Sequence, residues 1–157
     1  MNKSPFIIEL DADQNQVIRA KLINRSNSDQ LFLSVGFLQR SELVLISASG
    51  RCVTAFDTRS IKKYDNTVYK HSFQMLNFGE SVPFGESKFK KDARGNYSLR
   101  WGPFEFNDVT PGVYNVQVLW ESRMDSWYSS EENRLIRING VWLGSLYSNE
   151  VNINLPK

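Results

Sequence analysis

Cysteine and histidine, the side chains that most often serve as metal ligands or catalysts, are almost missing from this chain. Cys52 is its one cysteine and His71 its one histidine, so no disulfide can form within the chain and its stability must come from packing. A serine or cysteine nucleophile usually needs an imidazole held by a third group, and no Gly-x-Ser-x-Gly elbow accompanies His71, which lies between Lys70 and Ser72. We therefore expect a surface histidine, no catalytic residues, and a protein that binds rather than catalyses.

Metal and nucleotide sites also lack their usual residues. One histidine and one cysteine would need two distant carboxylates to complete a zinc site. Asp11, Asp13 and Asn15 echo the first half of a calcium loop, but Gln16 stands where that loop needs glycine and Leu22 replaces its closing glutamate. No glycine-rich phosphate loop follows a strand and precedes a helix. The sequence predicts no metal and no cofactor, and it predicts a polar hairpin turn at the calcium-loop echo.

Long apolar runs and an excess of one charge are missing as well. The apolar run near the N-terminus is too short for a signal-peptide core or a membrane span, so we expect no membrane insertion. The expected location is cytoplasmic, or periplasmic or in the cell envelope if a leader was removed. The 19 basic and 17 acidic side chains leave a formal charge of +2, which does not favour a nucleic-acid partner. We interpret two short basic clusters, Lys62 with Lys63 and Lys88 with Lys90 and Lys91, as solvated loop faces.

What the chain does have is apolar residues that alternate with a period of two. Its 157 residues, 41% apolar and 13% aromatic, suffice for the core of one domain spanning residues 1–157. No long stretch carries helical spacing, and about nine or ten short strands separated by turns predict an all-β sandwich or barrel. The expected strands cover residues 17–23, 31–38, 43–46, 52–56, 97–106, 114–120, 135–138, 141–146 and 151–155, with one more strand within 68–78, a helical turn within 58–66 and a loop at 79–96.

Turn residues indicate which of these strands form hairpins. Gly50 can adopt the positive φ of a tight turn between residues 43–46 and 52–56. The pair Asn139-Gly140 suits a type I′ turn, in which both positions need positive φ, and predicts a hairpin of residues 135–138 with 141–146.

The segment that begins at Pro111 carries the clearest pattern. Pro111 and Gly112 form a turn, after which Tyr114, Val116, Val118 and Trp120 all project to one face of a strand. A Pro-Gly-x-Tyr turn that enters an alternating strand resembles the tyrosine corner of immunoglobulin-like and fibronectin-like domains. In that corner the tyrosine hydroxyl donates a hydrogen bond to the backbone upstream.

Further short pieces are similar to the same family: Asn24-Arg25-Ser26, Gly79-Glu80-Ser81 and Ser148-Asn149-Glu150-Val151. Together they resemble the immunoglobulin-like modules of bacterial envelope proteins and of small intracellular proteinase inhibitors. The resemblance implies an immunoglobulin-like antiparallel β-sandwich of about nine or ten strands. The chain departs from antibody-type domains because it lacks their paired cysteines, so no inter-sheet disulfide is expected.

Residues 122–133 form a polar segment, predicted as a loop, that holds the aromatic pair Trp127 and Tyr128. Loops at the end of a sandwich often present binding residues, and Trp and Tyr are frequent interface anchors because they bury a large area for little lost entropy. We therefore predict a partner-binding site at Trp127 and Tyr128 with the flanking Met124 and Asp125. The partner would be another protein, plausibly an enzyme or toxin that the chain neutralises as an inhibitor or immunity protein. The oligomeric state stays open.

Two other functions remain possible from the sequence. A carbohydrate-binding or adhesion module of a bacterial envelope protein would show coplanar aromatic residues on one sheet face, for example Tyr97, Trp101 and Trp142. An enzyme would show a carboxylate pair in a cleft near Asp108 or Asp125.

Overall fold

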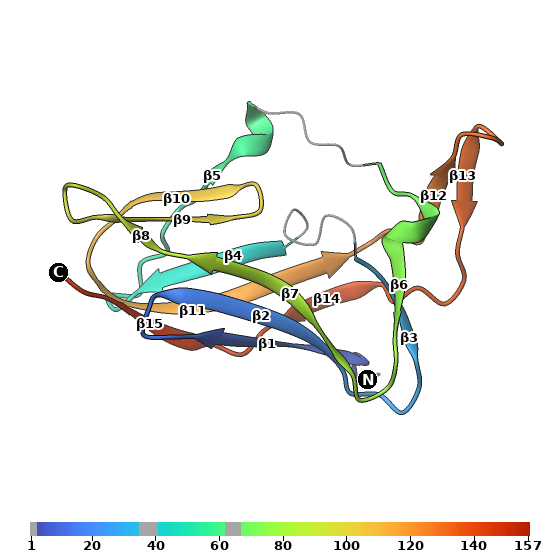
Figure 1. Ribbon diagram of the computed structural model, residues 1–157, viewed down its shortest axis with the longest axis horizontal. Coiled ribbons are helices and arrows are strands. Elements are labelled where there is room, and N and C mark those ends of the chain that lie inside the picture. The colour runs from blue at the N-terminus through green and yellow to red at the C-terminus, as the bar shows by residue number, and fades with distance from the viewer. Residues whose placement is uncertain (1–2, 35–40, 62–66) are drawn as a thin grey trace.

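Antiparallel β-strands make up most of the computed structural model, which describes residues 3–34, 41–61 and 67–157 (Figure 1). The strands are β1 (Phe6–Ala12), β2 (Val17–Asn24), β3 (Gln30–Leu33), β4 (Ser41–Ser47), β5 (Phe56–Asp57), β6 (Phe73–Leu76), β7 (Ser81–Lys88), β8 (Lys90–Lys91), β9 (Tyr97–Trp101), β10 (Phe104–Val109), β11 (Gly112–Ser122), β12 (Ser126–Ser129), β13 (Arg134–Arg137), β14 (Gly144–Tyr147) and β15 (Val151–Leu155). Two short 3-10 turns, η1 (Thr58–Ser60) and η2 (Lys70–Ser72), complete the described secondary structure. The all-β prediction is confirmed, and the predicted number of strands was too low.

The sheet β1–β2–β7 has β2 at its centre, paired with β1 along one edge and with β7 along the other. The predicted alternation in β2 is confirmed, because Ile18, Ala20 and Leu22 are buried while Arg19 and Lys21 are exposed. The β1–β2 connection is the predicted polar turn, in which the Asp13 carboxylate accepts hydrogen bonds from the backbone N–H groups of nearby turn residues.

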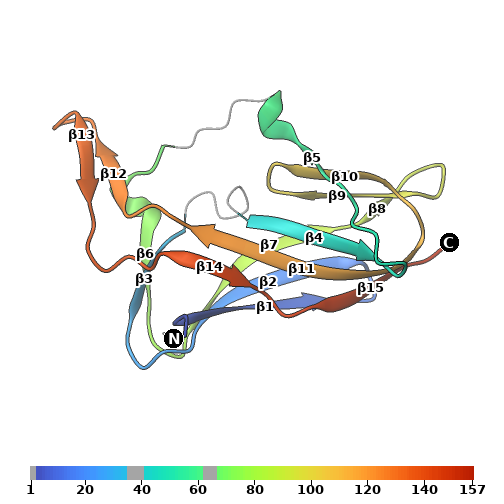
Figure 2. The ribbon, with the colours of Figure 1, turned by 180° about the vertical axis from the view of Figure 1, so that it is seen from behind.

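A second sheet is built on β11, the longest strand, with β4 along one edge and β15 and β14 sharing the other (Figure 2). Tyr114, Val116, Val118 and Trp120 are all buried, as the sequence predicts. The Tyr114 hydroxyl donates a hydrogen bond of 2.7 Å to the Thr110 carbonyl oxygen. The hydrogen bond expected of a tyrosine corner is therefore present.

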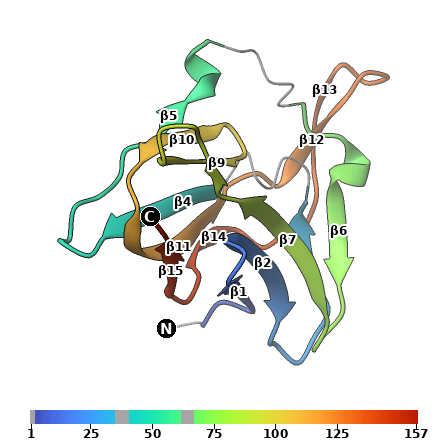
Figure 3. The ribbon, with the colours of Figure 1, turned by 60° about the vertical axis from the view of Figure 1, so that its left-hand side comes forward.

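A third sheet has the order β5–β10–β9–β8. Its β9–β10 hairpin turns at Gly102 and Pro103, within the residues 97–106 expected as strand. β7 leads through the buried Phe89 directly into β8, so the first and third sheets are neighbours along the chain. Figure 3 shows the end of β7 beside β9.

The three sheets share one core. The largest fully buried side chains are Trp101 of β9 and Trp120 of β11. Trp101 also satisfies its indole N–H, which donates to the hydroxyl of Ser41 at 2.9 Å. At the edge of β1 that does not pair with β2, a side chain takes the place of a strand at one residue. The amide of Asn149 donates to the Leu10 carbonyl at 3.0 Å and accepts from the Leu10 N–H at 2.7 Å.

Three predicted segments were wrong. Residues 79–96, predicted as a loop, contain β7, an eight-residue strand paired with β2. The register shifts between Ala20 and Lys21, where Phe84 is an extra residue on β7. The bulge turns Phe84 into the core, where it is 4% exposed, and breaks the alternation by which a strand is recognised. Pro83, beside it, is a further signal typical of a break.

The hairpin around Asn139 and Gly140 was also wrong. Gly140 has the positive φ of a turn, +80°, but the strand before the turn, β13, pairs with β12, and β14 after it pairs with β11. Residues 122–133, predicted as a loop, thus contain a strand. A turn signal indicates where the chain reverses and does not say which strands pair beyond the turn.

The remaining local predictions have mixed outcomes. β3 (Gln30–Leu33) overlaps the strand predicted at 31–38 at residues 31–33, and residues 35–40 lie outside the described part of the chain. The helical turn predicted within 58–66 is present as η1. Residues 62–66, including Lys62 and Lys63, lie outside the described part of the chain. β6 confirms the strand within 68–78, and β15 the last strand. Gly50 turns with φ +80°, but residues 52–56 meet β4 in one isolated bridge.

Among the described residues no helix is long and apolar enough to cross a membrane.

Candidate functional site

The predicted binding residues lie on and beside the β12–β13 hairpin, which projects from one end of the molecule (Figures 1 and 2). In its register Trp127 is opposite Ile136 and Tyr128 is opposite Leu135. Successive side chains of a strand point to opposite faces, so these two cross-strand pairs lie on opposite faces of the hairpin.

The two faces differ in exposure. Tyr128 is 41% and Leu135 64% exposed, whereas Trp127 and Ile136 are half-buried. The outward face therefore carries an apolar pair that the prediction identified only in part. Leu135 was missed because its strand was assigned to a different hairpin.

The two flanking residues of the prediction, Met124 and Asp125, are half-buried at the base of the hairpin. The Asp125 carboxylate accepts from the guanidinium of Arg137 at 2.9 Å. Asp125 thus holds the two ends of the hairpin together, and its charge is balanced within the site.

Two more ion pairs lie in and before the hairpin, at its tip and at the end of β11. Arg134 contacts Glu132 at 2.5 Å, and Arg123 contacts Glu121 at 2.9 Å. Each is an exposed pair between close neighbours in sequence and stabilises the fold little. In the hairpin itself, the charges of Arg134 and Arg137 are thus each compensated by a neighbouring carboxylate.

The tip of the hairpin is held by the Tyr128 hydroxyl, which donates a hydrogen bond to the side-chain oxygen of Asn133. Asn133 has a positive φ of 50°, a conformation that asparagine tolerates better than most residues. The exposed tyrosine is therefore fixed in place, although its ring faces solvent.

One edge of the hairpin is covered and the other is open. The Tyr128 N–H points away from β13 and donates to the Val68 carbonyl at 3.1 Å, and the Ile138 N–H donates to the Asp125 carbonyl at 2.7 Å. Because hydrogen-bonded and non-hydrogen-bonded pairs alternate in an antiparallel ladder, the N–H and C=O groups of Leu135 and Arg137 point away from β12. No hydrogen bond joins those groups to another residue within 3–34, 41–61 or 67–157.

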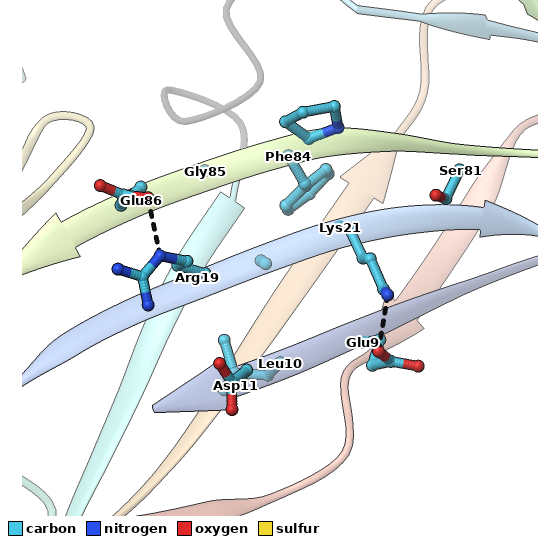
Figure 4. A pocket seen from close by; sticks show the side chains of 11 residues that line it. Glu9, Leu10, Asp11, Arg19, Lys21, Ser81, Phe84, Gly85 and Glu86 are labelled. Atoms are coloured by element: carbon cyan, nitrogen blue, oxygen red, sulfur yellow. Dashed lines mark hydrogen bonds and ion pairs between the residues drawn. The ribbon is translucent and has the colours of Figure 1, made fainter. Parts of the chain in front are cut away.

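A cavity of about 900 Å³ lies elsewhere, on the outer face of the β1–β2–β7 sheet (Figure 4). Four of its five charged side chains are paired across the strands, Lys21 with Glu9 at 2.9 Å and Arg19 with Glu86 at 3.0 Å. Arg19 also donates to Asp13 at 2.8 Å, and this hydrogen bond holds the pKa of the Asp13 carboxyl below its usual value. Four of the five charges in the cavity are thus compensated by ion pairs, and Asp11 carries the fifth.

An enzyme would show a carboxylate pair in a cleft near Asp108 or near Asp125, and these two residues are far apart. Asp108 precedes β11 and Asp125 follows it, and eleven residues of strand span about 36 Å. The cavity beside Asp108 has no second carboxylate among the described residues that line it, and Asp125 is paired with Arg137. His71 is exposed, as predicted, and stacks on Tyr69 with ring centroids 5.4 Å apart. In the described part of the chain no three His, Cys, Asp or Glu side chains gather as a metal site would require.

The aromatic platform proposed for carbohydrate binding is wrong. Tyr97 and Trp101 are 4% and 0% exposed, so neither can stack on a sugar. Trp142 packs edge-on against Phe6 and lies 5.0 Å from Trp120, centroid to centroid. These aromatic residues belong to the core and its border.

A scan of protein-family models found no match to the chain, and comparisons with curated proteins and with solved structures found no significant match.

Proposed function

We propose that the chain is a non-enzymatic domain of the immunoglobulin-like β-sandwich class that binds another protein through the β12–β13 hairpin. The form we favour is an inhibitor or immunity protein that neutralises an enzyme or a toxin. The observation that carries the proposal is the exposed pair Tyr128 and Leu135 on a projecting hairpin. The tyrosine-corner hydrogen bond of Tyr114 supports the fold class.

The composition of the hairpin surface supports a protein partner. Interfaces commonly have an apolar or aromatic centre inside a polar border, with tyrosine enriched at the centre. Here the centre is Tyr128 with Leu135, and the border contains the ion pairs of Arg134 and Arg137. Because the Tyr128 ring is already held by its hydrogen bond to Asn133, little side-chain entropy would be lost on binding.

The open edge of β13 adds a second way of contact. Two N–H donors and two carbonyl acceptors, from Leu135 and Arg137, face outward beside the apolar pair. An extended segment of a partner can pair with such an edge, and its side chains then contact the exposed face. The hairpin therefore offers backbone contacts along the edge of β13 and side-chain contacts on the adjoining exposed face.

The proposal is tested by affinity capture from the source cell with the purified chain as bait. We expect the Tyr128→Ser, Leu135→Ser double variant to lose the captured partner, with affinity at least about 30-fold weaker, as for a central interface pair worth 2 kcal/mol. The matched control is Tyr147→Ser, because Tyr147 is 61% exposed on β14. An equal loss in both variants, or none in the double variant, contradicts the proposal.

Trp127→Ala tests the half-buried face of the same hairpin. Trp127 supports the strand from the side opposite Tyr128, so its truncation should weaken both partner binding and the local stability of the hairpin. If affinity and stability both stay unchanged, the placement of the site is wrong. The inhibitor form of the proposal further requires that the captured partner lose its activity when one equivalent of the chain is added.

A further inference from the structure

A groove of about 420 Å³ is lined by the end of β7 and by β8, β9 and β10. It is far along the chain from the hairpin and shares no residue with the site proposed above. The groove is lined by Ser87, Lys88, Lys90, Ser98, Leu99, Arg100, Glu105 and Asn107. Three of these side chains are cationic and one is anionic.

The two lysines are held on the groove side by the residue between them. Phe89 is 2% exposed, and its N–H donates to the Gln16 carbonyl at 3.0 Å. Because side chains alternate along a strand, Lys88 and Lys90 must both point outward when Phe89 points inward. Their Cα atoms are then about 7 Å apart, which allows both ammonium groups to contact one small ion.

Two carboxylates close to the lysines in register or in sequence have other neighbours. Glu105 is directly opposite Arg100 in the β9–β10 ladder, so these two side chains share one face of that hairpin. Asp92, the next acidic residue along the chain, uses a carboxylate oxygen to accept from the N–H groups of Arg94 and Asn96. Within the part of the chain that the structure describes, Lys88 and Lys90 form no ion pair.

Neutral hydrogen-bond donors complete the groove. Ser98 is opposite Lys90 in the register of β8 with β9, and Asn107 follows on β10. Neither side chain is hydrogen-bonded to another residue within the described ranges. Lysine ammonium, hydroxyl and amide groups are the donors that proteins use, with arginine, to hold phosphate oxygens.

We propose that this groove binds a tetrahedral oxyanion, a phosphate or sulfate group, free or carried by a small molecule. The lysine ammonium groups supply the charge, and Ser98 and Asn107 supply directed hydrogen bonds. The sequence interpretation of Lys88 and Lys90 as a solvated loop face changes accordingly, because both residues belong to strands that fix where their charges point.

The test is a titration of the full chain with inorganic phosphate, in which backbone amide NMR shifts report binding. The ionic strength is kept constant with chloride as the balancing ion. We expect saturable shifts confined to residues of β8, β9 and the end of β7. The Lys88→Gln, Lys90→Gln double variant should bind about fivefold more weakly, as expected when two exposed charge contacts of about 0.5 kcal/mol each are removed. A parallel titration with glycerol 3-phosphate separates the two sources, because tighter binding of the ester assigns the site to a phosphorylated small molecule.

The control is the Lys3→Gln, Lys70→Gln double variant, which removes the same charge from two exposed lysines outside the groove. It should bind phosphate as the unchanged chain does. Equal weakening in both double variants would reduce the effect to net charge and overturn the proposal. Shifts that never saturate, or that spread over lysines throughout the surface, would overturn it as well.

Discussion

Asn24, the last residue of β2, offers the sharpest test of how the fold is held together. Its side chain is 0% exposed. The amide donates to the carbonyls of Ser28 and Leu76, each at 2.9 Å, and its oxygen accepts from the N–H and hydroxyl of Ser26 at 3.0 and 2.7 Å. One buried amide thus joins the end of β2, the turn that follows and the end of β6.

The expected cost of Asn24→Ala follows from which partners can reach water. Ser26 and Ser28 lie in a turn at the surface and can be hydrated, so loss of their bonds costs about 0.5–1.5 kcal/mol. The Leu76 carbonyl is bonded at a buried position, and an orphaned buried acceptor costs about 1–3 kcal/mol. We expect the free energy of unfolding to fall by about 3 kcal/mol.

Equilibrium urea unfolding of Asn24→Ala beside Asn152→Ala measures this difference. Asn152 is an exposed residue of β15, and its truncation should change the free energy of unfolding by less than about 0.5 kcal/mol. The denaturant slope should stay the same in both variants, so that the change is one of stability. A loss below about 1 kcal/mol for Asn24→Ala would show that the buried amide does not link the three segments as described.

Two further predictions concern the tyrosine corner and the acid side of the stability curve. Tyr114→Phe removes the hydroxyl that donates to Thr110 and should lower the free energy of unfolding by about 1 kcal/mol. Urea unfolding measures this change against the control Tyr147→Phe, at an exposed residue of β14. An equal free energy of unfolding in the two variants would contradict the role of the corner. The pKa of the Asp13 carboxyl is depressed in the folded chain, chiefly by the Arg19 hydrogen bond. The stabilisation that the ionised carboxylate gives to the fold is therefore fully present above the pKa of the unfolded chain, about 4. It is lost as the pH falls through the pKa of the folded chain. Asp13→Asn should therefore flatten the fall in thermal stability below about pH 4, and an unchanged pH profile would count against the Arg19 contact.

The parts of the fold that the sequence predicted are those in which burial alternates with every residue. β2, β11 and β15 show this pattern from end to end, and local sequence is then sufficient to recognise both the strand and its inward face. β7 does not, because seven of its eight residues are exposed or half-buried around a bulge. It is a strand because β2 offers a long partner for it, and a partner more than fifty residues away cannot be seen in local sequence.

The sequence predicted the candidate site in part: it located the segment but not the side chains that face solvent. Trp127 and Tyr128 stand out as aromatics in a polar segment, and that signal located the hairpin. It could not say which ring faces outward, because that depends on the register of β12 with β13. The register places Tyr128 outward with Leu135, a residue whose exposure follows from strand pairing alone.

Fold and proposed site are separable in this molecule. The core cluster draws residues from all three large sheets and from β3 and β6, but it includes none from β12 or β13. Exposed residues outside a core contribute little to global stability, so replacement of Tyr128 and Leu135 should leave unfolding by urea almost unchanged. A loss of partner binding in that double variant can then be assigned to the surface of the hairpin, since the sheets beneath it remain folded.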